Sequence, residues 1–309
     1  MSTEGSTKAI FAAFMANLGI AVAKFVAFLI TGATSMLAES VHSAADTGNQ
    51  ALLILGKRRA ARDADEAHNF GYGRERFFYA VVVALVLFSL GALFAIYEGV
   101  HKVSHPEPVE SPLIAIGVLG IAIVLEGFSL KTAMSEARGT KGTQSWIQYI
   151  RRTKSPELPV VLLEDIGAMS GLAVALVAFV LAWRVDPVFD GYGSILIGVL
   201  LGLIAFVLAV EMKSLLIGEA ADAEEIAKIT AAIEATPEVQ RLIHLRTEHL
   251  GPETILVAFK ASFRPNVELG ELSVIVDTIE SSIRDALSLH AIIYVEPDVD
   301  RTQDIAQMP

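Results

Sequence analysis

The chain contains no cysteine among its 309 residues. Disulfide bonds, thiolate metal ligands and cysteine nucleophiles are therefore excluded. Any metal ion has to be bound by His, Asp, Glu or other oxygen donors, and such ligands favour a hard or borderline divalent cation.

Charged residues are also scarce, at 19% of the chain, whereas hydrophobic residues make up 53% and the mean hydropathy is +0.53. This composition is far more apolar than that of an average globular protein and predicts an integral membrane protein. The net charge of -11 argues against a nucleic-acid partner, because it repels phosphates. The chain has no nucleophile elbow, P-loop or HExxH motif, so we do not expect an enzyme.

Long apolar windows predict a bundle of six transmembrane helices. We expect the first span to be uncleaved, because the apolar stretch after the N-terminal MSTEGSTK is too long for a signal peptide. The windows cover approximately residues 9–30, 33–56, 77–100, 113–133, 158–183 and 191–216.

The positive charges between the spans predict the orientation of the chain. They gather in the second-to-third and fourth-to-fifth connections, which should therefore face the cytoplasm together with both termini. Because no organelle presequence is evident, we expect a bacterial plasma membrane. The residues are Lys57, Arg58, Arg59, Arg62, Arg74 and Arg76 in the first connection, and Arg138, Lys141, Arg151, Arg152 and Lys154 in the second.

After Gly218 the sequence takes on a soluble pattern. A capping box at Asp222 and Glu225 starts an amphipathic helix. Alternating apolar residues then predict strands, and a second helix lies between the last two of them. The expected strands cover 242–250, 254–263 and 291–296, and the second helix 272–287. We therefore divide the chain into a transmembrane domain, 1–217, and a cytoplasmic α+β domain of αββαβ, ferredoxin-like order, 218–309.

Polar residues interrupt the second span in the segment Met36–Asn49, MLAESVHSAADTGN. His42 and Asp46 are spaced i and i+4, so they lie on one face of a helix, and Glu39 joins that face one turn earlier. Asn49 is expected to form an interhelical hydrogen bond. Ionisable side chains are expensive at membrane depth, which makes this segment the first candidate for a functional site.

A second carboxylate lies at matching depth in the fifth span. Asp46 is about 11 residues from Lys57 and Asp165 is about 11 residues from Lys154, which places both roughly 16 Å from the same membrane surface. We expect His42, Asp46 and Asp165 to converge on one divalent cation. The alternative is that each residue forms hydrogen bonds that pack the helices together.

Other ionisable residues in the spans receive separate interpretations. Lys24 and Glu39 are predicted to form a structural ion pair. Glu126 is either a proton relay or the partner of a cation. Glu164 is adjacent to Asp165 and points about 100° away from it on a regular helix, so it is a candidate fourth ligand or proton carrier rather than an equivalent ligand.

The stretches GATSMLAESVHSAAD and DEAHNFGYGRER resemble the second helix and the following loop of the cation diffusion facilitator family of divalent metal transporters. In that family an [HD]xxxD pair on helix 2 and another on helix 5 build a tetrahedral transport site. The resemblance implies that His42, Asp46 and Asp165 are ligands, whereas Val161 stands at the fourth position. The fourth ligand is then water, Glu164 or another residue.

The segment WIQYIRRTKSPELPVVLLEDIGAMSG is similar to the branch typified by zinc transporter nine, which makes the altered site a feature of that branch. Further metal sites of the family are depleted. Asp65 and His68 match loop ligands, but Tyr72 replaces a histidine. His244 matches one cytoplasmic ligand, while Phe259 or its neighbour, Ser273 and Tyr294 stand where some members have histidines. The resemblance implies dimerisation through the cytoplasmic domain, without a binuclear zinc cluster.

Together these features predict a proton-coupled efflux transporter of divalent cations. Its partners would be the metal ion, protons, the lipid bilayer and a second copy of the chain. Zinc is the expected cargo, and no cofactor is expected. One alternative is transport of Mn2+, Fe2+ or Co2+, because His and carboxylate ligands discriminate weakly between these ions. The other is a membrane-bound metal sensor or scaffold that binds metal without transporting it.

Overall fold

A computed structural model describes residues 3–31, 34–108 and 112–299. The chain folds into two compact units. The first comprises the chain up to Arg59 together with Arg76–Lys213, and the second comprises Ala60–Glu75 and the chain from Ser214 onwards. The loop that joins the second and third spans therefore folds with the C-terminal unit, whereas the sequence analysis counted it with the transmembrane domain. The division at residue 217 stays a prediction.

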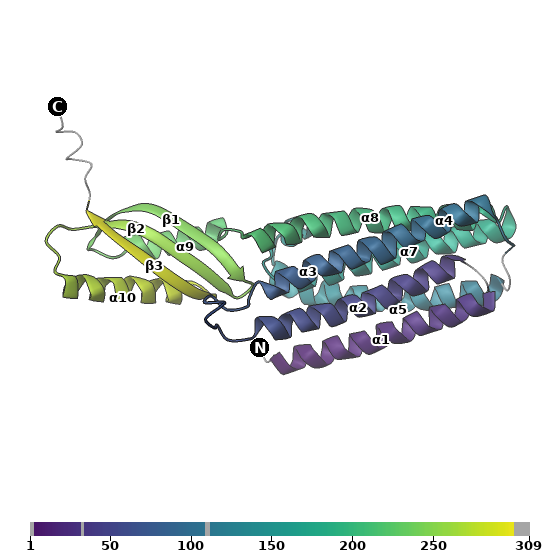
Figure 1. Cartoon of the computed structure of the whole chain (residues 1–309), viewed down its shortest axis with the longest axis horizontal. Coiled ribbons are helices and arrows are strands. Elements are labelled where there is room, and N and C mark those ends of the chain that lie inside the picture. Colours follow the sequence, from purple (N-terminus) through teal and green to yellow (C-terminus); the bar gives the residue numbers. More distant parts are fainter. Residues whose placement is uncertain (1–2, 32–33, 109–111, 300–309) are drawn as a thin grey trace, which may run out of the picture. The chain divides into compact units, whose positions relative to one another are not determined.

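The first unit consists of helices, and its long helices share one direction (Figure 1). A π-helical segment, η1, continues α3 into α4, so that the three form one span, Glu75–Ser104. The helices are α1 (Thr3–Thr31), α2 (Thr34–Ala60), α3 (Glu75–Val86), η1 (Leu87–Leu93), α4 (Phe94–Ser104), α5 (Pro112–Lys141), α6 (Trp146–Arg152), α7 (Glu157–Arg184) and α8 (Val188–Ile217).

The long helices form the predicted six-helix transmembrane bundle. Within the described residues, four segments are long and apolar enough to cross a membrane. They are Glu75–Ser104, Ala115–Gly139, Glu157–Arg184 and Val188–Ile217. Helices α1 and α2 have comparable lengths of 29 and 27 residues. Helix α2 is the most polar of the six, because it carries the acidic and imidazole side chains singled out above.

Close helix packing in this unit depends on glycine. Gly99 of α4 and Gly191 of α8 face each other so closely that a Cβ on either would lie 2.8 Å from the carbonyl oxygen of the other. Such small residues let the backbones of membrane helices approach each other closely.

At the start of α3, the Arg76 guanidinium contacts the Glu157 carboxylate of α7 at 2.5 and 2.8 Å. Helix α7 also packs along α5.

The second unit contains a three-stranded sheet in the order β1-β2-β3. The αββαβ order confirms the prediction, and β2 has the predicted bounds. Strands β1 and β2 pair as an antiparallel hairpin. β3 runs parallel to β2, because α10 provides the crossover. The elements are α9 (Ala223–Glu234), β1 (Val239–Gly251), β2 (Thr254–Phe263), α10 (Leu269–Ala286) and β3 (His290–Val299).

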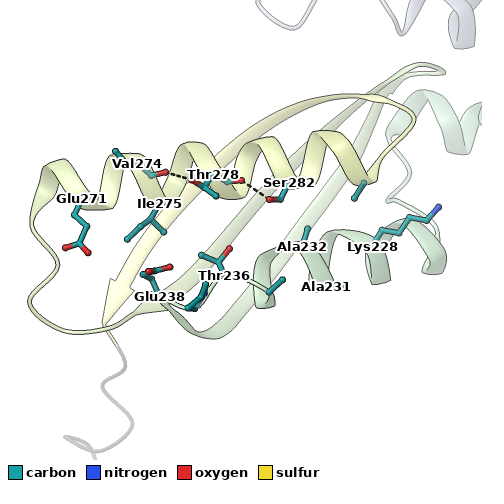
Figure 2. Close-up of a pocket in the computed structure, with 13 residues that line it drawn as sticks. Lys228, Ala231, Ala232, Thr236, Glu238, Glu271, Val274, Ile275, Thr278 and Ser282 are labelled. Atoms are coloured by element: carbon teal, nitrogen blue, oxygen red, sulfur yellow. Dashed lines mark hydrogen bonds between the residues drawn. The ribbon is translucent and has the colours of Figure 1, made fainter.

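Helices α9 and α10 contact each other and pack on the sheet. The predicted capping box at Asp222 and Glu225 is present at the start of α9. Ile229, Ile233 and Ile279 are fully buried in the core beneath the helices. Small and hydroxylated side chains along the seam between the helices leave a groove of about 740 Å³ (Figure 2).

The loop of residues 60–75 packs on the tip of the β1-β2 hairpin. A Cβ at Gly73 would lie 2.7 Å from the carbonyl oxygen of Leu250, so only glycine permits this approach. Arg74 forms an ion pair with Glu248 of β1. These contacts explain why the loop belongs to the second unit, which the sequence pattern did not indicate.

Candidate functional site

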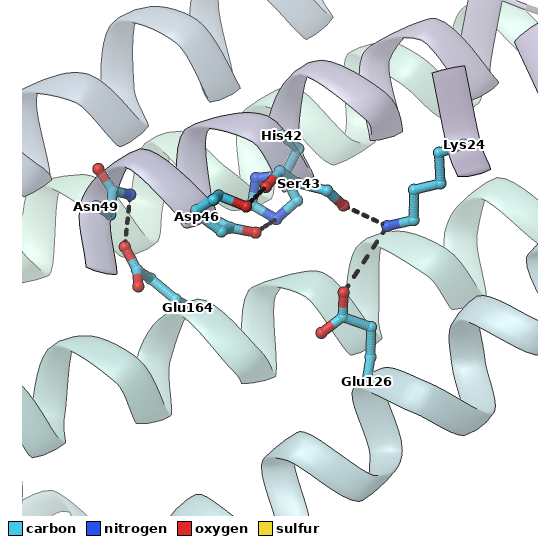
Figure 3. Close-up of polar contacts among 8 residues, drawn as sticks. Lys24, His42, Ser43, Asp46, Asn49, Glu126 and Glu164 are labelled. Carbon is cyan, nitrogen blue, oxygen red and sulfur yellow. Dashed lines mark hydrogen bonds and ion pairs between the residues drawn. The ribbon is translucent and has the colours of Figure 1, made fainter. Parts of the chain in front are cut away.

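His42 and Asp46 lie on one face of α2, as their spacing predicted (Figure 3). The Nε2 atom of His42 is 3.5 Å from an Asp46 carboxylate oxygen. Both side chains are buried, at 2% and 7% exposed. Gly91 of η1 lies beside the imidazole, since a Cβ there would be 3.9 Å from Nδ1. One side of the imidazole thus faces a π-helical segment, a geometry that is frequent at functional sites.

Asp165 lies on α7 and is also buried. The Ser129 hydroxyl of α5 donates a 3.2 Å hydrogen bond to its carboxylate. Asp165 lies within electrostatic range of Asp46 and Glu126. In the described part of the chain, no three His, Asp or Glu side chains form a ready-made ligand set, so the convergence of His42, Asp46 and Asp165 on one ion stays a prediction.

Glu164 points to a different neighbour than Asp165 does, as their adjacency on a helix requires. Its carboxylate accepts a 2.7 Å hydrogen bond from the Asn49 side-chain amide of α2 (Figure 3). This bond confirms the prediction that Asn49 bonds between helices, and it joins the two helices that carry the candidate ligands. Glu164 therefore lies beside the candidate site rather than at its centre.

Replacing Asn49 with Ala should destabilise the protein by about 1.5–3 kcal/mol, because the buried Glu164 carboxylate loses its donor. Glu164→Gln should cost less, since a Gln carbonyl still accepts from Asn49. The measurement is the unfolding free energy in mixed detergent micelles. Equal losses in the two variants would show that the Asn49 bond contributes little.

Lys24 of α1 is only 1% exposed and joins three helices. Its ammonium donates a 2.7 Å hydrogen bond to Ser43 of α2 and lies 3.8 Å from the Glu126 carboxylate of α5. Glu126 thus pairs with a cation, which was one of its two predicted interpretations. The side chain of Glu39 lies outside the described residues, so the Lys24–Glu39 pair stays a prediction.

In the described part of this region, buried carboxylates outnumber buried cationic side chains. Among the described side chains, the carboxylates of Asp46, Glu126, Glu164 and Asp165 are buried near the Lys24 ammonium and the His42 imidazole. Buried carboxylates are costly at membrane depth unless protons or cations neutralise them. The cluster is therefore suited to bind either a divalent cation or protons. Ser129 was not predicted to take part, although it lies three residues after Glu126 on the same face of α5.

The first secondary site, in the loop of residues 60–75, is closed by its own side chains. One oxygen of Asp65 accepts hydrogen bonds from the backbone of Ala67 and His68, and the other accepts a 2.5 Å bond from the Tyr72 hydroxyl. Arg62 lies over the Tyr72 ring at 4.2 Å. The Tyr72 hydroxyl thus donates a hydrogen bond to the Asp65 carboxylate, at the position where the family resemblance expects a histidine.

The Tyr72 hydroxyl is the main reason that the pKa of Asp65 lies below its ordinary value. In Tyr72→Phe we expect this pKa to rise toward the ordinary value, as measured by NMR titration of the labelled carboxyl carbon. Because the folded pKa is lowered, the linked stability is present above the ordinary Asp pKa and is lost as pH falls through the folded pKa. An unchanged titration midpoint would contradict the assignment.

The second secondary site lies on the cytoplasmic sheet, where His244 is exposed and pairs in register with Lys260 of β2. The Lys260 ammonium contacts Glu296 at 2.8 Å and Asp298 at 3.0 Å. These carboxylates raise the pKa of Lys260, and the Lys260 ammonium in turn neutralises their charge.

His249 of β1 was not predicted as a site residue. It is buried, and its Nε2 atom lies 3.5 Å from a Glu225 carboxylate oxygen.

Both parts of the chain match known domain families. Residues 10–217 match the cation efflux transmembrane domain, and residues 221–298 match the cytoplasmic domain of cation efflux proteins.

Individual relatives are similar over most of the chain. The mitochondrial proton-coupled zinc antiporter SLC30A9 of Xenopus laevis is 33% identical over 241 residues, which cover 77% of this chain and 43% of the relative. The metal tolerance protein C4 of Arabidopsis thaliana is 30% identical over 272 residues, 87% of this chain and 59% of the relative. The cation-efflux pump FieF of Klebsiella pneumoniae is 28% identical over 282 residues, which cover 90% of this chain and 87% of the relative. The chain thus spans less than half the length of the zinc antiporters it matches.

Proposed function

The chain belongs to the cation efflux, or cation diffusion facilitator, family, and on this premise we propose that it exchanges a divalent metal ion for protons across a membrane. Zinc is the proposed ion. The single observation that carries the proposal is the buried pair of His42 and Asp46 on α2, within electrostatic range of the carboxylate of Asp165 on α7.

The chemistry of these ligands supplies the coupling. A neutral imidazole and ionised carboxylates bind a divalent cation, whereas protonation of the same groups expels it. Metal and protons therefore compete for one site, and a proton gradient drives metal in the opposite direction. Because α2 and α7 both carry ligands and are joined through Asn49 and Glu164, a relative movement of these two helices would open the site to alternate sides.

The fourth ligand is proposed to be water or Glu164. Val161 cannot coordinate a metal ion, and Glu164 needs a local change in α7 and the loss of its bond to Asn49 before it reaches the site. Glu126 is proposed as the neutralising partner of Lys24, and a proton relay through it remains the second proposal. The protein is not proposed to be an enzyme.

The names of the relatives support zinc and proton coupling, because one group is named as proton-coupled zinc antiporters. We propose a homodimer formed through the cytoplasmic domain, with both termini in the cytoplasm. The mitochondrial name of those antiporters gives no support to the bacterial plasma membrane expected from the sequence, which stays a prediction.

The test is metal uptake into proteoliposomes with an imposed pH gradient, with Zn2+, Mn2+, Co2+ and Fe2+ compared at equal concentration. We expect Zn2+ to be transported fastest. Faster uptake of another ion would correct the cargo and keep the exchange mechanism. Saturable metal binding without uptake of any ion would contradict transport and favour the alternative of a membrane-bound metal sensor.

A further inference from the structure

The connection between α5 and α7 contains a helix that the sequence analysis did not predict. Helix α6 begins at a capping box in which Ser145 and Gln148 satisfy each other's backbone N–H groups. The membrane-crossing segments on either side are Ala115–Gly139 and Glu157–Arg184. Because only a few residues separate α6 from both, it has to lie at the membrane surface where α5 ends and α7 begins.

This connection has a charge opposite to that of the whole chain. Between Arg138 and Lys154 there are five Lys or Arg residues and no Asp or Glu, which gives +5 in a chain of net charge -11. The side chains of Arg151 and Arg152 are exposed, although Arg151 is also 3.8 Å from Glu211 of α8. Such a cluster beside membrane spans attracts anionic headgroups.

The apolar side chains of α6 fit the same surface. Tyr149 is buried and anchors the helix to its own unit, while Ile147 is 70% exposed. Trp146 packs edge-on against Tyr149 at 6.4 Å, and the Lys141 ammonium lies 5.2 Å from its ring. Trp and Tyr beside Lys and Arg are typical of the headgroup region, where one end of the side chain is apolar and the other is wet.

We propose that α6 and its basic flanks form a membrane-surface anchor that binds anionic phospholipid headgroups. Ile147 inserts into the upper acyl region, and the guanidinium and ammonium groups bind phosphates. Charge complementarity favours a lipid over a protein partner, because the anchor is held at the bilayer by the two adjacent spans. The proposal does not depend on which ion the protein transports.

The absence of native cysteine permits a site-specific test. A spin label on Ile147→Cys is compared with one on Leu269→Cys, an exposed position of α10 in the other unit. The protein is reconstituted in phosphatidylcholine vesicles with and without phosphatidylglycerol. We expect the label at 147 to be protected from an aqueous nickel chelate and accessible to oxygen, more strongly with phosphatidylglycerol, while the label at 269 stays in water.

The headgroup requirement is tested in Arg151→Gln/Arg152→Gln, with Lys228→Gln/Arg284→Gln as a control that removes two cations from the other unit. Retention of phosphatidylglycerol on the purified protein should weaken about five-fold per removed charge in the first variant and should not change in the control. Equal nickel accessibility at 147 and 269, or no dependence on phosphatidylglycerol, would overturn the proposal. Protection of position 147 only in native membranes would indicate an acidic protein partner instead.

Discussion

Replacing Asp46 or Asp165 with Asn is expected to lower the rate of proton-driven metal uptake by about 100-fold or more. The reason is that an amide is a poor metal ligand and cannot exchange a proton near neutral pH. Even the loss of a residue that only orients a metal ligand costs about 10–100-fold in affinity or activity, so the loss of a ligand should cost at least as much. Initial rates in proteoliposomes, normalised to folded protein, measure the effect.

A matched control for these variants is Asp190→Asn. Asp190 is a fully buried carboxyl group of the same bundle, but it lies on α8, with an oxygen 3.8 Å from the Lys102 ammonium. Its replacement removes a buried charge without touching the proposed site. We expect the folded fraction of this variant to retain most of its transport rate. A loss as large as that in Asp46→Asn would show that any buried charge change disables the bundle.

Replacing Lys24 with Met is expected to destabilise the protein by about 3–5 kcal/mol, because it leaves the buried Glu126 carboxylate without the nearby ammonium. Glu126→Leu should have a similar cost, because it leaves the buried Lys24 ammonium without the nearby carboxylate. The double variant Lys24→Met/Glu126→Leu should recover most of the loss, since apolar residues can replace a buried ion pair at little cost. The free energy of unfolding in mixed micelles completes the double-mutant cycle.

The same cycle separates the two proposed interpretations of Glu126. If Glu126 only neutralises Lys24, the double variant should transport metal at close to the rate of the unchanged protein. If Glu126 carries protons, transport should stay low even though stability is recovered. Additive destabilisation, with no recovery in the double variant, would contradict the pairing itself.

Much of the fold was predictable because it follows from local patterns. Period-two alternation gave the correct bounds of β2, and the Asp222 capping box gave the start of α9. Helix α6 was missed because its seven residues are too few to show a helical period. Its Ser145 and Gln148 capping box was nevertheless present in the sequence.

The candidate site was predictable in part. The spacing of His42 and Asp46 fixes their shared helix face, whatever the tertiary structure. The partner of Lys24 was not predictable, because depth along a helix does not reveal which helices are neighbours. Glu126 lies on α5, and α1 packs against that helix. Likewise, the Asn49 bond to Glu164 depends on the rotation of α7, which sequence periodicity does not determine in an apolar span.

The exchange of metal for protons at the His42 and Asp46 site is tested most directly by recording both fluxes at once. Proteoliposomes carry a zinc-sensitive dye and a pH-sensitive dye, and zinc is added outside without an imposed pH gradient. We predict that zinc entry makes the interior more alkaline, because each entering ion displaces protons outward, and that both signals disappear in Asp46→Asn. Zinc entry without a pH change, or paired signals that persist in Asp46→Asn, would contradict the account.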